Sequence, residues 1–131
     1  MLSHDAQILI VDDMKMVRTA IKRYLTSLGY KNIIEAENGA EAVKKFKDNK
    51  IDFILMDIVM PIMTGLEALK EIHGLDSDVP VAMLSSVADQ KTIGDCMLLG
   101  AIGYILKPIS AESGPKNLKK VLEKAYFSKA P

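Results

Sequence analysis

Residues 51–61 read IDFILMDIVMP, in which an apolar run after Asp52 surrounds a second carboxylate, Asp57, and ends at a Met-Pro pair. The apolar side chains around that carboxylate are Phe53, Ile54, Leu55, Met56, Ile58 and Val59. An ionised side chain among so many apolar neighbours is costly unless a nearby group neutralises its charge. The stretch therefore predicts a buried strand over residues 52–57 that ends in a carboxylate with a neutralising partner.

Four more short apolar runs lie before and after this one. Together the five runs are 7–13, 32–36, 52–57, 79–85 and 103–108. Continuous apolar runs of this length are typical of strands buried on both faces of a parallel sheet. The segments that follow them look helical, at about 17–28, 39–49, 65–73, 88–99 and 115–127. Repeated strand–helix units with right-handed crossovers predict an α/β fold, a doubly wound five-stranded parallel sheet in the common flavodoxin-like order 2-1-3-4-5.

The composition is that of one domain of ordinary size. The chain has 131 residues, 49% of them hydrophobic, and its 17 basic and 17 acidic residues balance, which gives no sign of a nucleic-acid or anionic membrane partner. No apolar run approaches the roughly 20 residues that cross a bilayer. The N-terminus, MLSHDAQ, lacks the pattern of a signal peptide, and Cys96 is the only cysteine. We therefore expect a cytoplasmic protein without an intrachain disulfide.

Polar residues stand at the ends of four predicted strands. They are Asp12, Asp13, Asp57, Ser85 and Lys107. In an open α/β sheet, ligands bind outside the carboxyl ends of the strands, near the point where the strand order reverses. Strands one and three are neighbours there, so the three aspartates should lie close together and repel one another. Mg²⁺ suits such a carboxylate cluster, and the hydroxyl and the ammonium suit a phosphoryl group.

Each of these residues alone has a more ordinary explanation. An aspartate or serine at a strand end is usually a helix cap or a turn residue, and Lys-Pro is usually a turn. The coincidence of five such residues at one edge favours a functional site.

Elsewhere, Cys96 is expected in the core, and His4 and His73 are too isolated for a zinc site. The basic residues expected on a solvated helix face are Lys15, Arg18, Lys22 and Arg23.

Over residues 6–127 the chain resembles CheY-like response-regulator receiver domains of two-component signalling. The motifs that carry the resemblance are VDD at 11–13, MDIVMPIMTG at 56–65, LSS at 84–86 and GYILKP at 103–108. The resemblance implies that Asp57 accepts a phosphoryl group from a histidine kinase or a phosphotransfer protein. It also implies that Asp12, Asp13, Asp57 and the backbone carbonyl of Val59 hold Mg²⁺.

The same resemblance implies roles for three further residues. Ser85 and Lys107 would contact the phosphoryl oxygens, and the Lys107–Pro108 peptide bond would be cis. Tyr104 would turn inward when Ser85 moves toward the phosphate, which changes a surface made by the fourth helix, the fifth strand and the fifth helix. That surface would regulate a downstream protein, which the sequence does not name.

We expect residues 1–131 to form a single receiver domain, a monomer or a phosphorylation-dependent dimer. Such a domain catalyses only its own phosphorylation and dephosphorylation. In receivers that hydrolyse quickly, polar residues two positions after the acceptor aspartate and after the strand-four hydroxyl help to hold the attacking water. Here those positions are Val59 and Val87, which predicts a long-lived phosphoryl group.

Three alternatives to this interpretation can be compared with the sequence. A haloacid-dehalogenase-type phosphatase also uses an aspartate, Mg²⁺ and a lysine, but it needs a second aspartate where this chain has Val59. An unphosphorylated, receiver-like scaffold would lack one or more of Asp13, Asp57 and Lys107, and all three are present. The chain can also be a receiver fragment of a larger response regulator.

Overall fold

The computed structural model describes residues 2–86 and 90–129, which form five alternating strands and helices. The elements are β1 (Gln7–Val11), α1 (Lys15–Ser27), β2 (Asn32–Ala36), α2 (Gly39–Asp48), β3 (Phe53–Asp57), α3 (Gly65–Leu75), β4 (Val81–Ser85), α4 (Gln90–Leu98), β5 (Gly103–Leu106) and α5 (Gly114–Lys129). All strand pairs are parallel, and the order β2-β1-β3-β4-β5 is the one that the sequence predicts. None of the described helices is long and apolar enough to span a membrane.

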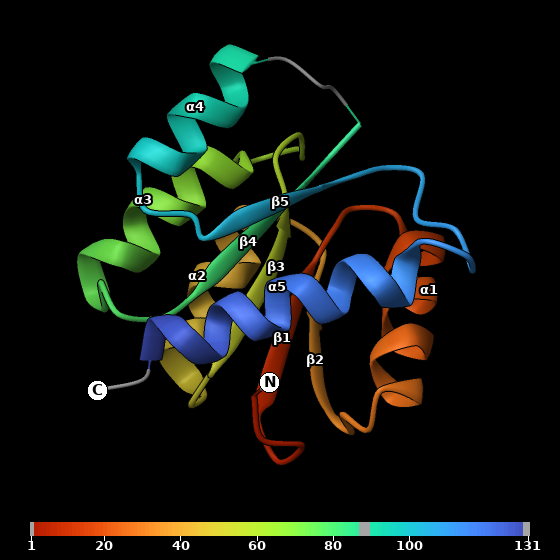
Figure 1. Ribbon diagram of the computed structural model, residues 1–131. Coiled ribbons are helices and arrows are strands. Elements are labelled where there is room, and N and C mark those ends of the chain that lie inside the picture. Colours follow the sequence, from red (N-terminus) through yellow and green to blue (C-terminus); the bar gives the residue numbers. More distant parts are fainter. Residues whose placement is uncertain (1, 87–89, 130–131) are drawn as a thin grey trace.

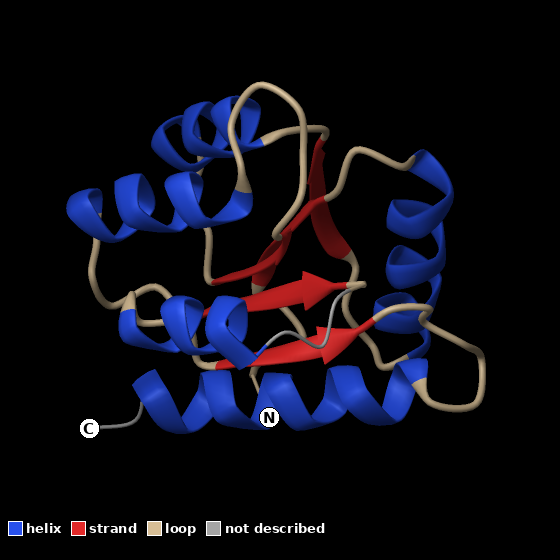
Figure 2. Ribbon diagram, turned by 90° about the horizontal axis from the view of Figure 1, so that it is seen from above, coloured by secondary structure: helices blue, strands red, loops and turns tan. Residues whose placement is uncertain are grey.

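Helices cover both faces of the twisted sheet (Figures 1 and 2). One core lies between the sheet and α2, α3 and α4, with Leu69 and Ile72 of α3 completely buried. The other lies between the sheet and α1 and α5, with Ile21 and Leu122 completely buried. Every residue of β3 and β4 is buried, so these two strands read as continuous apolar runs.

The structure differs from the expected elements mainly at the margins. β2 and β5 are edge strands, so they are only partly buried, and alternate residues of β5 face outward. Helix α5 continues to Lys129, beyond the expected end at residue 127, because Ala125 of its last turns still packs in the core. The expected start of the fourth helix at residue 88 lies outside the described residues.

The connection from β3 to α3 places Asp57 against the start of a helix. Thr64 caps α3 in a capping box with Glu67. The Gly65 N–H donates to the carbonyl of Ile58 over 2.8 Å. A Cβ atom at Gly65 would lie 2.1 Å from the carbonyl oxygen of Asp57, so only glycine permits this close approach. Gly65 thus lets α3 start directly beside the end of β3.

Candidate functional site

The acidic residues meet where the carboxyl ends of β1 and β3 lie side by side. Asp57 is the last residue of β3, and Asp12 and Asp13 directly follow β1. One carboxylate oxygen from each of the three lies within 4.8 Å of the others, and this is the one such acidic or metal-ligating group among the described residues. Asp12 and Asp57 are buried, whereas Asp13 is exposed. The arrangement is a carboxylate cluster with one open side.

Asp12 is held by hydrogen bonds from several directions. Its Oδ1 accepts from the backbone N–H of Met14 over 2.9 Å, and its own backbone N–H donates to the carbonyl of Ala36 over 3.1 Å. Its Oδ2 accepts from Nζ of Lys107 over 2.5 Å. Asp12 therefore combines the turn role of an aspartate at a strand end with a place in the charged cluster.

Lys107 follows β5 and spans the cluster from the far side of β4. Its Nζ lies 3.2 Å from Oδ2 of Asp57 as well as 2.5 Å from Asp12. Burial lowers the pKa of Lys107, but the two carboxylates together raise it by more, so its pKa lies above the ordinary value. The ammonium is thus firmly charged. The Lys107–Pro108 peptide bond is cis, which confirms the prediction.

The electrostatic environment of Asp57 opposes its ionisation. Burial and the nearby charge of Asp12 raise its pKa, while Lys107 and a hydrogen bond from the backbone of Val59 lower it by less. Its pKa therefore lies above the ordinary value. A partly desolvated carboxylate beside a second buried carboxylate attracts a further cation.

The remaining predicted site residues lie around this cluster. Ser85 ends β4 and is buried, and its carbonyl accepts the backbone N–H of Lys107 over 2.7 Å. Tyr104 lies on β5 with 44% of its surface exposed, so its ring faces outward. Val59, two residues after Asp57, is 68% exposed. Val87 lies outside the described residues.

The expectation that Arg18 belongs to a solvated helix face is wrong. Only 7% of its surface is exposed, and with Ile21 and Leu25 it forms the buried side of α1. The spacing of these three residues at i, i+3 and i+7 is the signal that could have shown this. Its guanidinium donates to the backbone carbonyl of Asp12 and to Glu35. Sequence reasoning missed this link to the acidic cluster.

The donor set of the cluster fits a hard divalent cation. Asp12, Asp13 and Asp57 offer carboxylate oxygens, which Mg²⁺ and Ca²⁺ prefer, and no histidine or cysteine joins them in the described part of the chain. Mg²⁺ is usually bound by one or two protein carboxylates, with waters and phosphate oxygens completing an octahedron. An exposed Asp13 and an open side suit that mode of binding.

The comparison with protein families decides which class of protein carries this site. The model of the response regulator receiver domain matches residues 8–119. The chain belongs to this family. Among curated proteins, this receiver domain is 40% identical over 116 residues to the chemotaxis protein CheY of Bacillus subtilis (strain 168), an alignment that covers 88% of this chain and 97% of the relative.

Solved structures agree with this assignment. A chain of the CheX–CheY–BeF₃–Mg²⁺ complex from Borrelia burgdorferi superposes with a TM-score of 0.85 at 30% identity, covering 92% of this chain and 89% of that one. A CheY-like receiver domain protein from Methanospirillum hungatei JF-1 gives a TM-score of 0.85 at 28% identity, covering 95% and 97%. The receiver domain described here is therefore of the CheY type, with an acidic cluster that can bind a metal ion.

Proposed function

We propose that this receiver domain is a phosphorylation-activated switch in which Asp57 accepts a phosphoryl group from a histidine kinase or a phosphotransfer protein. The observation that carries the proposal is the convergence of three carboxylates and one lysine at the edge of the sheet. A related chain of known structure comes from a complex that contains Mg²⁺ and BeF₃, a mimic of a phosphoryl group. We expect the same groups to bind at this cluster.

In the proposed reaction, a carboxylate oxygen of Asp57 attacks the phosphorus atom. The phosphorus–nitrogen bond to the donor histidine breaks, and the imidazole leaves with the electron pair. The nucleophile is the ionised form of Asp57, which burial and Asp12 disfavour, whereas Lys107 favours it and a bound Mg²⁺ would add to that effect. Lys107 and the hydroxyl of Ser85 are the proposed contacts of the phosphoryl oxygens.

Asp12, Asp13, Asp57 and the backbone carbonyl of Val59 are the proposed Mg²⁺ ligands. The bound ion would neutralise negative charge on the oxygens of the transferring group. In the structure, Nζ of Lys107 contacts Oδ2 of Asp12 and Oδ2 of Asp57. It would have to share these oxygens with the metal, so ion binding and the position of Lys107 should be coupled.

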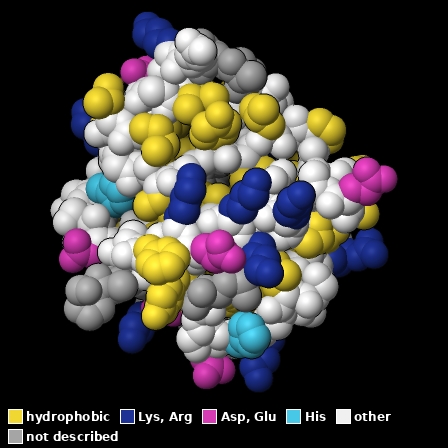
Figure 3. Space-filling model, viewed as in Figure 1, with side chains coloured by type: hydrophobic (Ala, Val, Ile, Leu, Met, Phe, Trp, Pro, Cys, Tyr) yellow, Lys and Arg dark blue, Asp and Glu magenta, His cyan; other side chains and the backbone are white. Residues whose placement is uncertain are grey.

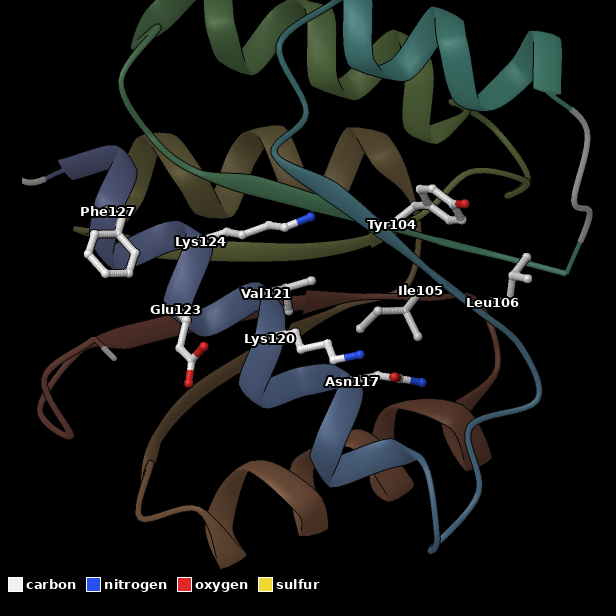
Figure 4. Close-up of a pocket in the computed structure, with 9 residues that line it drawn as sticks. All are labelled: Tyr104, Ile105, Leu106, Asn117, Lys120, Val121, Glu123, Lys124 and Phe127. Atoms are coloured by element: carbon white, nitrogen blue, oxygen red, sulfur yellow. The ribbon is translucent and has the colours of Figure 1, made fainter.

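The proposed output surface is the face made by α4, β5 and α5. Hydrophobic side chains gather in the region of α4 and β5 above a row of basic side chains along α5 (Figure 3). Tyr104 and Leu106 of β5 line a hollow together with Lys120, Lys124 and Phe127 of α5 (Figure 4). An inward turn of Tyr104, coupled to Ser85, would change the shape of this face.

We further propose that residues 1–131 act as one cytoplasmic receiver domain that binds protein partners. The downstream target and a phosphorylation-dependent dimer are both candidates for the output surface. The phosphatase alternative is disfavoured because Val59 has no proton to transfer at the position of the second aspartate. The scaffold alternative predicts no response to a phosphoryl mimic, which makes it directly testable.

The test is an NMR titration with beryllofluoride. We expect changes at Asp57 only when Mg²⁺ is also present, and we expect them to extend to Tyr104 and α4. The variant Asp57→Asn should show none of the Mg²⁺-dependent beryllofluoride changes. Changes confined to the neighbourhood of Asp57 would contradict the switch, and no binding by the parent protein would favour the scaffold.

A further inference from the structure

Arg18 is a buried cation that links the turn after β1, which carries Asp12 and Asp13, to Glu35 of β2. Its Nη1 donates to the backbone carbonyl of Asp12 over 2.7 Å, and its Nε donates to Oε1 of Glu35 over 3.1 Å. Its Nη2 lies 3.8 Å from Oε1 of Glu37. A charge buried to this degree is expensive unless its hydrogen bonds are well formed. The guanidinium is therefore held in one orientation by groups just after β1 and around the end of β2.

The carbonyl of Asp12 belongs to the peptide group between Asp12 and Asp13. Its orientation sets the direction in which Asp13 leaves the strand. The backbone N–H of Asp12 is already held by Ala36, and Oδ1 is held by Met14. The bond from Arg18 fixes the remaining main-chain acceptor of Asp12. The turn that carries two of the three carboxylates is thus held from both sides.

We propose that Arg18 is a positioning residue for the metal site, which sets the separation of the Asp12 and Asp13 carboxylates through the peptide between them. The inference rests on the proposed Mg²⁺ site. The contact between Arg18 and Asp12 is to the backbone carbonyl and not to the carboxylate. Arg18 acts through the backbone of Asp12, and Glu35 keeps its guanidinium in place.

Loss of Arg18 changes the affinity for Mg²⁺ in opposite directions if the residue acts through its charge or by positioning the turn, which makes the proposal testable. A guanidinium close to the acidic turn repels Mg²⁺, and its removal would also leave the carboxylate of Glu35 without this partner. If Arg18 acted through its charge alone, its loss would tighten Mg²⁺ binding. If it positions the turn, its loss weakens Mg²⁺ binding.

The experiment measures the affinity for Mg²⁺ alone by isothermal titration calorimetry, with Arg18→Met and Lys22→Met compared with the parent. Lys22 is the matched control, because it is a second cation of α1. Its Nζ lies 4.0 Å from the same Glu35, and 52% of its side chain is exposed. We expect Arg18→Met to weaken binding about tenfold, the lower end for partners that orient metal ligands. Lys22→Met should change the affinity by less than about twofold, because exposed ion pairs contribute little.

Arg18→Lys keeps the positive charge. If Arg18→Met does not fold, this variant distinguishes the positioning role of Arg18 from an effect of its charge. An ammonium cannot reproduce the fork that reaches Asp12 and Glu35 together, so we expect weaker Mg²⁺ binding here too. The amide signals of Asp12 and Asp13 should shift in metal-free Arg18 variants and stay in place in Lys22→Met. Unchanged or tighter binding by the folded Arg18 variants would overturn the proposal. A parent protein that binds no Mg²⁺ would contradict the metal site itself, and this inference with it.

Discussion

Nζ of Lys107 lies closer to Asp12, at 2.5 Å, than to Asp57, at 3.2 Å. In the described part of the chain, this ammonium directly contacts both buried carboxylates. We expect Lys107→Met to destabilise the metal-free protein by about 3 kcal/mol, the lower end for removing one partner of a buried ion pair, since buried charge is then left uncompensated. Millimolar Mg²⁺ should restore most of that loss. Urea unfolding with and without Mg²⁺ measures both effects, and the exposed Lys47→Met is the control. Equal stability of parent and Lys107→Met without Mg²⁺ would be inconsistent with this role.

Asp57→Asn should stabilise the metal-free protein at neutral pH. Burial and the charge of Asp12 raise the pKa of Asp57 above the unfolded value of 3.8, so its ionisation costs stability in the folded state. The stability that protonated Asp57 provides is present below pH 3.8 and is lost as the pH rises through the raised folded pKa. We expect the free energy of unfolding of Asp57→Asn to exceed that of the parent by on the order of 1 kcal/mol at pH 7, a typical size for a single substitution.

The advantage of Asp57→Asn over the parent should shrink as the pH is lowered toward 4, because the parent then takes up the proton. Chemical denaturation in a chelating buffer across this range measures the trend. A variant that is less stable than the parent at pH 7 would show that the attraction of Lys107 exceeds the cost of burial.

Val59→Asn should shorten the lifetime of the phosphorylated protein. Val59, two residues after Asp57, is 68% exposed and can neither donate nor accept a side-chain hydrogen bond. An amide there can hold an attacking water in line with the phosphorus, and we expect decay to speed up by roughly threefold to tenfold, less than preorganised donors achieve in enzymes. Decay of the phosphoryl group after removal of the donor gives the rate. Val87→Glu tests the second position, alone and in a double variant with Val59→Asn. Unchanged decay in both single variants and in the double variant would show that these valines do not set the lifetime of the phosphoryl group.

Ile62→Asn should stabilise the protein. Ile62 is a β-branched residue with φ at +71° and 83% of its surface exposed, in a turn closed by the Met63 N–H and the carbonyl of Pro61 over 2.7 Å. Asparagine tolerates this conformation better, so we expect a gain of about 0.5–1 kcal/mol. Thermal unfolding tests it, with Leu98→Asn as an exposed apolar control at 87% exposure in α4. A similar gain in Leu98→Asn would indicate a general benefit of removing surface apolar groups.

The alternation of strands and helices could be predicted from the apolar runs, and the strand order from the arrangement that is common for such a sheet. Once β1 and β3 are neighbours, Asp12 and Asp57 must end at the same edge. The burial of Cys96 follows from the same pattern and is confirmed. The partner of Lys107 could not be predicted, because the choice between Asp12 and Asp57 depends on the turn after β1 and the loop after β5.

Two further features escaped sequence reasoning for different reasons. The charge of Arg18 predicts an exposed position, whereas its spacing from Ile21 and Leu25 places it on the buried side of α1. The positive φ of Ile62 has no signal in the sequence, since isoleucine disfavours that conformation. It arises because the chain must turn sharply between the end of β3 and the capped start of α3.

The most direct test of the central proposal is the intact mass of the protein after incubation with acetyl phosphate. The attack of Asp57 breaks the phosphorus–oxygen bond, and acetate leaves with the electron pair. We predict the addition of one phosphoryl group to the parent in the presence of Mg²⁺, a similar addition to the control Asp48→Ala, whose aspartate is an exposed residue of α2, and none to Asp57→Ala. An unmodified parent, or an equal adduct on Asp57→Ala, would contradict the assignment of Asp57 as the phosphoacceptor.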